Sequence, residues 1–272
     1  MIGQKNLIEK LNSFEKFPKF SIFVGQKGSG RKTLINEYIV PMFTEQGYVT
    51  YTLTDVKIDS IRDMIKNAYQ AHSMLYLITD ADNMSVGAKN AMLKIVEECP
   101  NNNYFIMTLE DENSTLPTIK SRAVIYHMDA YSKEELKEYA DTDISHLDIC
   151  ETPGEIDLLE AMNPDEFYEY VIKVVDNIAK VSGSNSFKIA EKIAFKEEDE
   201  NKYDLKLFWK AFIKECMSRA ENLLNEKKDR EGIDYMIGAR DTSRTLRRLL
   251  SRSINRQMLF DKWILDIRED WR

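Results

Sequence analysis

The spacing of hydrophobic positions changes along the chain and divides it into two parts. In the first part, short apolar or β-rich runs predict strands, and the continuous apolar runs at 74–79 and 104–109 suit strands buried on both faces of a parallel sheet. These runs are residues 20–24, 48–53, 74–79, 104–109 and 124–127. Apolar residues between them recur at helical spacing. Strands that alternate with helices predict an α/β domain with a parallel sheet over residues 1–128.

Beyond residue 128 the pattern is helical. Ser132 and Glu135 form a sequence that is typical of a helix capping box, and Pro164 suits the first position of a helix. We predict a small helical domain over residues 129–163 and a larger all-α domain over residues 164–272.

Composition and charge narrow the class of protein. No apolar run reaches the roughly 18 residues that span a bilayer, and the polar N-terminus has no apolar segment typical of a signal peptide. We therefore expect a cytoplasmic protein with no membrane contact. The net charge of −8 argues against a protein that wraps DNA by its overall field. The three cysteines and three histidines are not spaced as a zinc site requires, so no metal is expected.

The first motif that carries chemistry runs from Gly25 to Thr33, between a predicted strand and a predicted helix. A phosphate-binding P-loop occurs at such a place, because its glycines let backbone N–H groups turn toward phosphate. These glycines are Gly25, Gly28 and Gly30. A working loop then has a lysine followed by a serine or threonine that binds Mg²⁺. Here Arg31 and Lys32 hold those two positions.

Both replacements indicate a degenerate nucleotide site. A planar guanidinium does not reproduce a compact ammonium beside phosphates, and a protonated lysine cannot bind Mg²⁺. A shift by one residue would bring Lys32 and Thr33 into register, but it requires an unusual loop. We favour a glycine turn that now serves the structure, and this leaves nucleotide binding by the loop doubtful.

A second motif follows the apolar run at residues 74–79. An active site would have an aspartate for Mg²⁺ here and an adjacent glutamate that positions water. Asp80 holds the first position and Ala81 holds the second. Alternatively, Asp80 caps the turn that follows it. In either case the missing glutamate agrees with a site that does not hydrolyse ATP.

Four stretches, in this order, resemble the clamp-loader subunits of bacterial DNA polymerase III. They are Ile58–Arg62, Asp80–Met84, Ala88–Pro100 and Leu116–Ala123. Within that AAA+ family, the resemblance implies the δ′ type and not the ATPase type, τ or γ. Arg31 and Ala81 spoil the two nucleotide motifs, and Gly154 stands where the ATPase subunits carry an arginine that senses nucleotide.

The resemblance also implies a function in trans. Arg122, which alone would pass for a surface charge, is then an arginine finger that reaches ATP on a neighbouring subunit. The chain itself would bind no cofactor, since the neighbour holds ATP and Mg²⁺. Implied partners are τ- or γ-type ATPase subunits and a δ-type subunit, with the sliding clamp and primer-template DNA reached through the complex. Residues 129–163 would be the lid and residues 164–272 the collar through which the subunits form a ring.

The chain departs from the family in two ways. It lacks the four-cysteine zinc module that often follows the P-loop helix, and it is short, which together suggest a reduced version. Two alternatives stay open: a self-sufficient ATPase that uses Lys32, Thr33 and Asp80, and an adaptor of the helicase-loader kind.

In the last domain, arginines recur at every fourth residue: Arg240, Arg244, Arg248, Arg252 and Arg256. We favour ion pairs for this row over binding to DNA or an acidic partner, and we expect Trp209, Trp263 and Trp271 in the core or collar interface.

Overall fold

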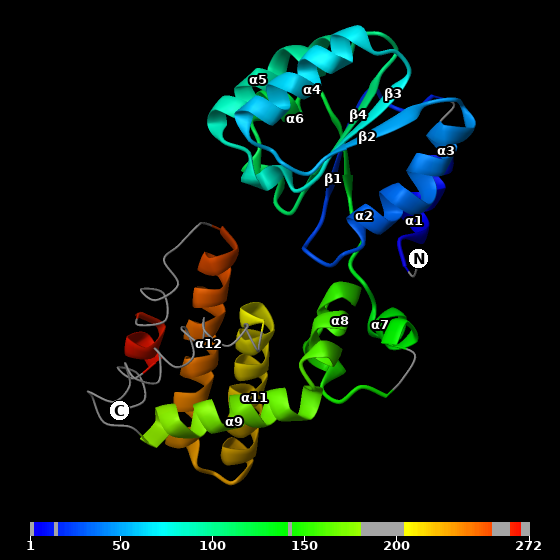
Figure 1. Cartoon of the computed structure of the whole chain (residues 1–272). Coiled ribbons are helices and arrows are strands. Elements are labelled where there is room, and N and C mark those ends of the chain that lie inside the picture. Colours follow the sequence, from blue (N-terminus) through cyan, green and yellow to red (C-terminus); the bar gives the residue numbers. More distant parts are fainter. Residues whose placement is uncertain (1–2, 14–15, 141–142, 181–203, 252–261, 268–272) are drawn as a thin grey trace. The chain divides into compact units, whose positions relative to one another are not determined.

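The computed structural model describes residues 3–13, 16–140, 143–180, 204–251 and 262–267. The chain separates into two compact units (Figure 1). The first contains residues 1–141 together with Thr152–Gly154, and the second contains residues 142–151 and 155–272. The division into 1–128, 129–163 and 164–272 stays a prediction.

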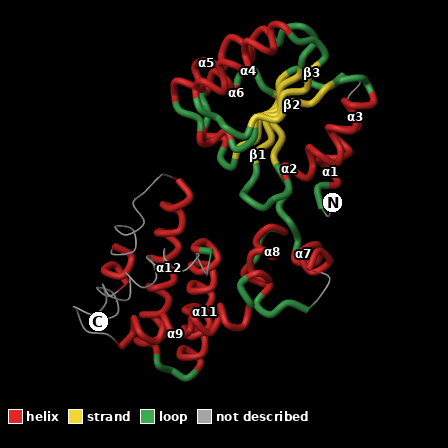
Figure 2. The backbone as a smooth tube through the Cα atoms, viewed as in Figure 1, coloured by secondary structure: helices red, strands yellow, loops and turns green. Residues whose placement is uncertain are grey.

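Five parallel strands form the sheet of the first unit, which confirms the α/β prediction (Figure 2). Their order across the sheet is β2-β3-β4-β1-β5. The central strand β1 pairs with β4, where Phe20 lies opposite Phe105, and with β5, where Ser21 lies opposite Val124. The strands are β1 (Phe20–Val24), β2 (Val49–Leu53), β3 (Met74–Ile78), β4 (Tyr104–Leu109) and β5 (Val124–His127). Because all run the same way, the loops that follow them meet at one edge of the sheet.

Helices cover both faces of this sheet (Figure 1). Neighbouring residues of β1 point to opposite faces, so Ile22 packs in one core and Phe23 in the other. This explains why the inner strands β1, β3 and β4 are largely apolar and buried, whereas the edge strands β2 and β5 are partly exposed. One face carries α4 (Ile58–Gln70), α5 (Val86–Glu98) and α6 (Pro117–Lys120). The other carries α1 (Lys5–Asn12), α2 (Arg31–Leu34), the π-helical η1 (Ile35–Ile39) and α3 (Val40–Glu45).

Polar side chains begin several of these helices. The Ser85 hydroxyl accepts a hydrogen bond from the Ala88 amide at 3.2 Å, as a cap of α5. The capping box is confirmed at α7 (Lys133–Ala140), where the Glu135 amide donates to the Ser132 hydroxyl at 3.1 Å and the Glu135 carboxylate accepts from the Ser132 amide at 2.8 Å.

Asp59 and Ser60 are residues of types that often cap helices, but neither caps α4. Lys57 occupies the cap position and α4 begins at Ile58, two or three residues earlier than a cap at Asp59 or Ser60 would place it. The Asp55 carboxylate accepts hydrogen bonds from the Ser60 hydroxyl at 2.9 Å and the Lys57 amide at 3.3 Å. Since Asp55 bonds both groups, the first turn of the helix forms without a cap from Asp59 or Ser60.

Helices make up the second unit. They are α8 (Pro153–Ala161), α9 (Pro164–Lys180), α11 (Leu205–Asn225) and α12 (Asp229–Ser251), with a helical stretch at 262–267. The first two residues of α8, Pro153 and Gly154, belong to the first unit. Trp209 and Trp263 are fully buried, which confirms the prediction of core tryptophans, and Trp271 lies outside the described residues. The Trp263 indole donates to the Thr242 hydroxyl at 2.8 Å. Within the described ranges, no helix is long and apolar enough to cross a bilayer.

A buried carboxylate joins α8 to α11 inside the second unit. Glu155 is 4% exposed and accepts hydrogen bonds from Lys210 Nζ at 2.8 and 2.9 Å. Lys206 Nζ lies 2.8 Å from the same carboxylate, and the Glu151 amide donates to it at 2.8 Å. The charge of Glu155 is therefore compensated where water is excluded.

Ion pairs engage the start of the arginine row on α12. Arg240 Nε and Arg244 Nη1 lie 2.9 and 3.2 Å from Oδ1 of the buried Asp241. For these two arginines the structure agrees with the interpretation as ion pairs. The Arg248 side chain, Arg252 and Arg256 lie outside what the structure describes.

Candidate functional site

The glycine loop joins the end of β1 to the start of α2. The Gly25 amide donates to the Leu109 carbonyl at 3.1 Å, which ties the loop to the end of β4. Gly28 and Gly30 both have φ of 81°, in the left-handed region that favours glycine. The loop therefore lies at the carboxyl edge of the sheet, where α/β proteins bind their ligands.

Three successive carbonyl oxygens of this loop accept hydrogen bonds from a later part of the same unit. The Lys27 oxygen accepts a long bond from the Thr152 hydroxyl at 3.5 Å. The Gly28 oxygen accepts from the Gly154 amide at 3.1 Å, and the Ser29 oxygen accepts from the Tyr131 hydroxyl at 2.9 Å. The chain thus fixes the conformation of the loop with its own groups.

Gly154 packs directly on the loop. A Cβ atom at Gly154 would lie 2.5 Å from the Gly28 Cα, and a Cβ at Gly28 would lie 2.9 Å from the Gly154 Cα. Both distances are too short for real contacts, and both involve backbone that cannot move aside cheaply. By resemblance, Gly154 stands where ATPase subunits carry an arginine that senses nucleotide. In this chain that position has no room for a side chain.

Arg31, which replaces the P-loop lysine, is buried at 6% exposure. Its Nη1 has no hydrogen-bond partner among the described residues, and its Nη2 lies 3.8 Å from a Glu110 oxygen, beyond hydrogen-bond reach. Burial lowers the pKa of Arg31, while the carboxylates of Glu110, Asp82 and Asp80 raise it. The guanidinium stays charged in proteins, so this is a buried and incompletely compensated positive charge.

Lys32, which replaces the Mg²⁺-binding residue, pairs with Asp80. Its Nζ lies 2.7 Å from Asp80 Oδ2, and both side chains are about half exposed. Asp80 has φ of 54° and its amide donates to the Thr108 hydroxyl at 3.0 Å. Asp80 occupies the cap position of η2 (Ala81–Asn83), where its carbonyl oxygen accepts from the Asn83 amide at 3.2 Å, but its carboxylate makes no cap bond. Thr33 is exposed, and Lys32 is the residue that reaches Asp80.

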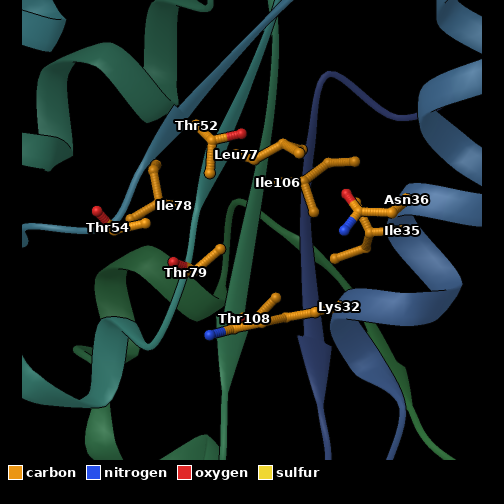
Figure 3. A pocket seen from close by; sticks show the side chains of 10 residues that line it. All are labelled: Lys32, Ile35, Asn36, Thr52, Thr54, Leu77, Ile78, Thr79, Ile106 and Thr108. Carbon is orange, nitrogen blue, oxygen red and sulfur yellow. The ribbon is translucent and has the colours of Figure 1, made fainter.

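A pocket of about 170 Å³ lies beside this pair, between the P-loop helix and the ends of β2, β3 and β4 (Figure 3). Lys32, Ile35 and Asn36 line it from the helix side, where η1 forms a π-helical turn. Four threonines contribute to the opposite wall: Thr52, Thr54, Thr79 and Thr108. Ligand pockets for larger molecules start near 300 Å³, so this one suits a small polar group and not a nucleotide.

Asp82 is a site residue that the sequence reasoning missed. Its carboxylate accepts hydrogen bonds from the Glu110 and Asp111 amides at 2.8 and 3.1 Å and from the Ser114 hydroxyl at 2.7 Å. It thereby holds the loop that follows β4. The only signal in the sequence was its place two residues after Asp80.

Arg122 lies after α6, just before β5. Its Nη1 donates to the Thr118 carbonyl at 3.0 Å, and its Nη2 lies 3.5 Å from a Glu97 oxygen of α5. The side chain is 38% exposed. In the described part of the chain, no hydrogen bond or ion pair joins Arg122 to the glycine loop. The candidate residues thus form two separate groups, one at the loop and one at Arg122.

Known proteins match parts of this chain. Residues 48–132 match the family model described as "DNA polymerase III, delta subunit". A replication factor C small subunit of Aeropyrum pernix is 25% identical over 206 residues, 67% of this chain and 63% of its own length. The DNA polymerase III subunit delta′ of Haemophilus influenzae is 29% identical over 84 residues, 29% of this chain and 26% of its own. A DNA polymerase III gamma subunit-related protein of Thermotoga maritima has a TM-score of 0.47 at 15% identity, over 98% of this chain and 99% of that one.

The strand order, the glycine loop after β1 and the aspartate after β3 define a P-loop domain of the AAA+ class. Over the matched stretches the chain is similar to clamp-loader subunits of DNA replication. The chain spans less than two thirds of the length of these curated relatives.

Proposed function

We propose that this chain is a δ′-type clamp-loader subunit of DNA replication that hydrolyses no ATP and supplies Arg122 to a neighbour. Its partners are τ- or γ-type ATPase subunits and a δ-type subunit in the cytoplasm. Through them it acts on a sliding clamp and primer-template DNA. The observation that carries the proposal is the bond of Lys32 to Asp80, since these two positions hold Mg²⁺ in an active P-loop protein.

The residues at this site do not fit Mg²⁺. A metal there needs oxygen ligands, and an ammonium 2.7 Å from the carboxylate repels a second cation instead. Ala81 is fully buried and offers no carboxylate for positioning water. The three changes, Arg31, Lys32 and Ala81, therefore remove metal binding and water activation together.

Arg122 has the features of a finger that acts in trans. Its guanidinium is partly exposed, and it contacts the Thr118 carbonyl, the Ser121 hydroxyl at a long 3.5 Å and the exposed Glu97 carboxylate, which a stronger anion can displace. An arginine finger raises the rate of nucleotide hydrolysis by about 10³ to 10⁵ because it stabilises charge on the transferred phosphoryl group. The Thr118 carbonyl holds one nitrogen and so limits how far the side chain can swing.

The test is the ATPase activity of a complex reconstituted from this chain and its clamp-loader ATPase subunits. Arg122→Ala should lower the activity by about a hundredfold or more while the complex still assembles. Arg62→Ala is the control, because Arg62 is an exposed arginine of the same unit whose ion pair is with Asp59 of the same helix. Unchanged activity of the Arg122→Ala complex would contradict the proposed role.

The alternatives give different results. The pure chain should not hydrolyse ATP, and Mg²⁺-dependent hydrolysis that is lost in Lys32→Ala would favour a self-sufficient ATPase. Co-purification with a replicative helicase, in place of clamp-loader ATPases, would favour the adaptor. The matches with clamp-loader proteins support neither alternative.

A further inference from the structure

Strand β2 forms one edge of the sheet and pairs with β3 alone. The Leu53 carbonyl accepts from the Thr79 amide at 3.1 Å, so the main-chain groups of Leu53 point toward β3. Successive residues of a strand direct their N–H and C=O groups to alternate sides, and those of Thr50 and Thr52 therefore point away from the sheet. Among the residues that the structure describes, none forms a hydrogen bond with these outward groups. The edge can thus accept a further strand.

The side chains of β2 do not protect this edge. Val49 is 61% exposed, Tyr51 is 39% exposed, and Thr52 is exposed as well. Edge strands usually carry a lysine, a proline or a bulge, which prevents another strand from pairing with them. Strand β2, whose residues are all described, has none of these. The opposite edge strand, β5, ends in His127, which lies 3.3 Å from a Glu112 oxygen. The unprotected edge is therefore β2.

The sequence of β2 is nearly the same in both directions about Tyr51. A threonine flanks Tyr51 on each side, and an aliphatic residue follows at each end, Val49 and Leu53. An antiparallel copy related by a two-fold axis at Tyr51 sets Thr50 opposite Thr52, and it sets Tyr51 opposite itself. The outward groups of Thr50 and Thr52 then bond each other across the axis, and aromatic and threonine pairs stabilise antiparallel strands. This register uses all five residues and places no charged side chains opposite each other.

We propose that β2 pairs with β2 of a second copy of this chain, antiparallel and about a two-fold axis at Tyr51, so that one sheet continues through both copies. Two short strands bury far less than the roughly 800 Å² per partner of a stable interface, so the dimer is weak and forms when the chain is concentrated. Each copy has a net charge of −8, and salt should strengthen the pairing because it screens their repulsion. The pairing goes beyond the proposed function, because Arg122 precedes β5 at the opposite edge of the sheet.

Disulfide trapping of the full chain tests the position of the axis. The two copies of Tyr51 would form a non-hydrogen-bonded pair with Cα atoms about 4.5 Å apart, within reach of a disulfide, so Tyr51→Cys should give a covalent dimer under mild oxidation. The two copies of Val49 would lie roughly 13 Å apart along the strands, which is too far. Val49→Cys is therefore the control, and random collisions would link it at least as well because Val49 is more exposed. Equal or faster cross-linking of Val49→Cys overturns the proposal, and the wild type gives the background of the native cysteines.

Sedimentation equilibrium measures the pairing without a cross-link. We expect the wild type to show a monomer–dimer equilibrium that shifts toward the dimer as salt is added. Tyr51→Lys should weaken the dimer about tenfold or more, because two ammonium groups would meet at the axis. Val86→Lys places the same charge at an exposed apolar position of α5 and should leave the equilibrium unchanged. A wild type that stays monomeric leaves the edge to a strand of another protein and overturns the proposal, as does association that salt weakens.

The thermal midpoint of each variant shows whether it is folded. The Tyr51 ring lies 5.7 Å from the Tyr76 ring, so its replacement removes one contact of the core. If Tyr51→Lys does not fold, the contrast between Tyr51→Cys and Val49→Cys still decides the question. All these variants retain Arg122. Failure of the pairing therefore stays distinguishable from failure of the ATPase test on the reconstituted complex.

Discussion

The amide of Gly154 donates a hydrogen bond to the carbonyl oxygen of Gly28 at 3.1 Å, backbone against backbone. The contact is so close that neither residue can carry a side chain. Thr152 and Tyr131 bond the two adjacent carbonyls of the loop. The conformation of the glycine loop thus depends on residues far away in the sequence, and on the absence of a Cβ at one of them.

Gly154→Ala should destabilise the protein by about 1 to 3 kcal/mol, because the new methyl group overlaps the Gly28 backbone. Urea unfolding measures this change. Gly87→Ala is the control: Gly87 lies in α5, and the nearest atom to a new methyl group there is the flexible end of Ile58 at 3.2 Å. That variant should be neutral or slightly stabilised, since alanine favours a helix over glycine. A loss as large in Gly87→Ala as in Gly154→Ala would contradict the argument.

Asp82→Ala should destabilise the loop after β4, because the Glu110 and Asp111 amides and the Ser114 hydroxyl lose their common acceptor. We expect a loss of about 2 kcal/mol in the free energy of unfolding. Amide hydrogen exchange should show faster exchange at residues 110 and 111. Asp59→Ala, at an exposed carboxylate whose ion pair is with Arg62, should change neither quantity.

The buried Glu155 should make stability depend on pH. Burial alone would raise the pKa of Glu155, but bonds from Lys206, Lys210 and the Glu151 amide outweigh it, so its pKa lies below the ordinary 4.5. A carboxyl group with a lowered folded pKa is more acidic in the folded state. The contribution of Glu155 to the free energy of unfolding is therefore complete above about pH 4.5. It is lost as the pH falls through the lowered pKa of Glu155 in the folded state.

Glu155→Gln tests this dependence in urea unfolding at several pH values. The variant should be less stable than the wild type at neutral pH by about 3 kcal/mol, because Lys206 and Lys210 lose their buried counter-charge. The difference should shrink as the solution becomes acidic. Glu160→Gln, at an exposed position of the same helix, should follow the wild type at every pH. A difference for Glu155→Gln that is constant with pH would disprove the electrostatic explanation.

Thr242→Val should destabilise the helical unit by about 1 to 3 kcal/mol, because the buried Trp263 indole loses its acceptor while the volume stays similar. Thr242→Ser retains the hydroxyl and should restore most of the loss. Tryptophan fluorescence during thermal unfolding reports on both variants. If valine and serine behave alike, the hydrogen bond contributes nothing measurable.

Much of the α/β unit could be predicted from local pattern. The five strands, the position of the glycine loop and the caps at Ser85 and Ser132 follow from rules that act over a few residues. The strand order was not accessible in this way, because it depends on which strands pair across long separations in the sequence. The placement of Asp80 at the carboxyl edge followed from the parallel sheet alone.

The contacts of the site could not be predicted to the same extent. Four aspartates look alike in the sequence: Asp55, Asp59, Asp80 and Asp82. They differ in the folded chain, because different groups bond to each carboxylate. Asp55 takes the Ser60 hydroxyl, Asp82 takes two amides after β4, and Asp80 takes the Lys32 ammonium. The sequence shows that Gly154 replaces an arginine of similar proteins. The close backbone contact between Gly154 and Gly28 is visible only in the folded chain.

The chain passes between its two compact units at three places: after Asp141, after Glu151 and after Gly154. The α/β unit is therefore assembled from two separate segments of sequence. A fragment that stops at residue 141 would lack Thr152 and Gly154, and the Lys27 and Gly28 carbonyls would lose their donors. A truncated chain that is meant to contain the whole α/β unit therefore has to extend at least through Gly154. It then includes residues 142–151, which belong to the second unit.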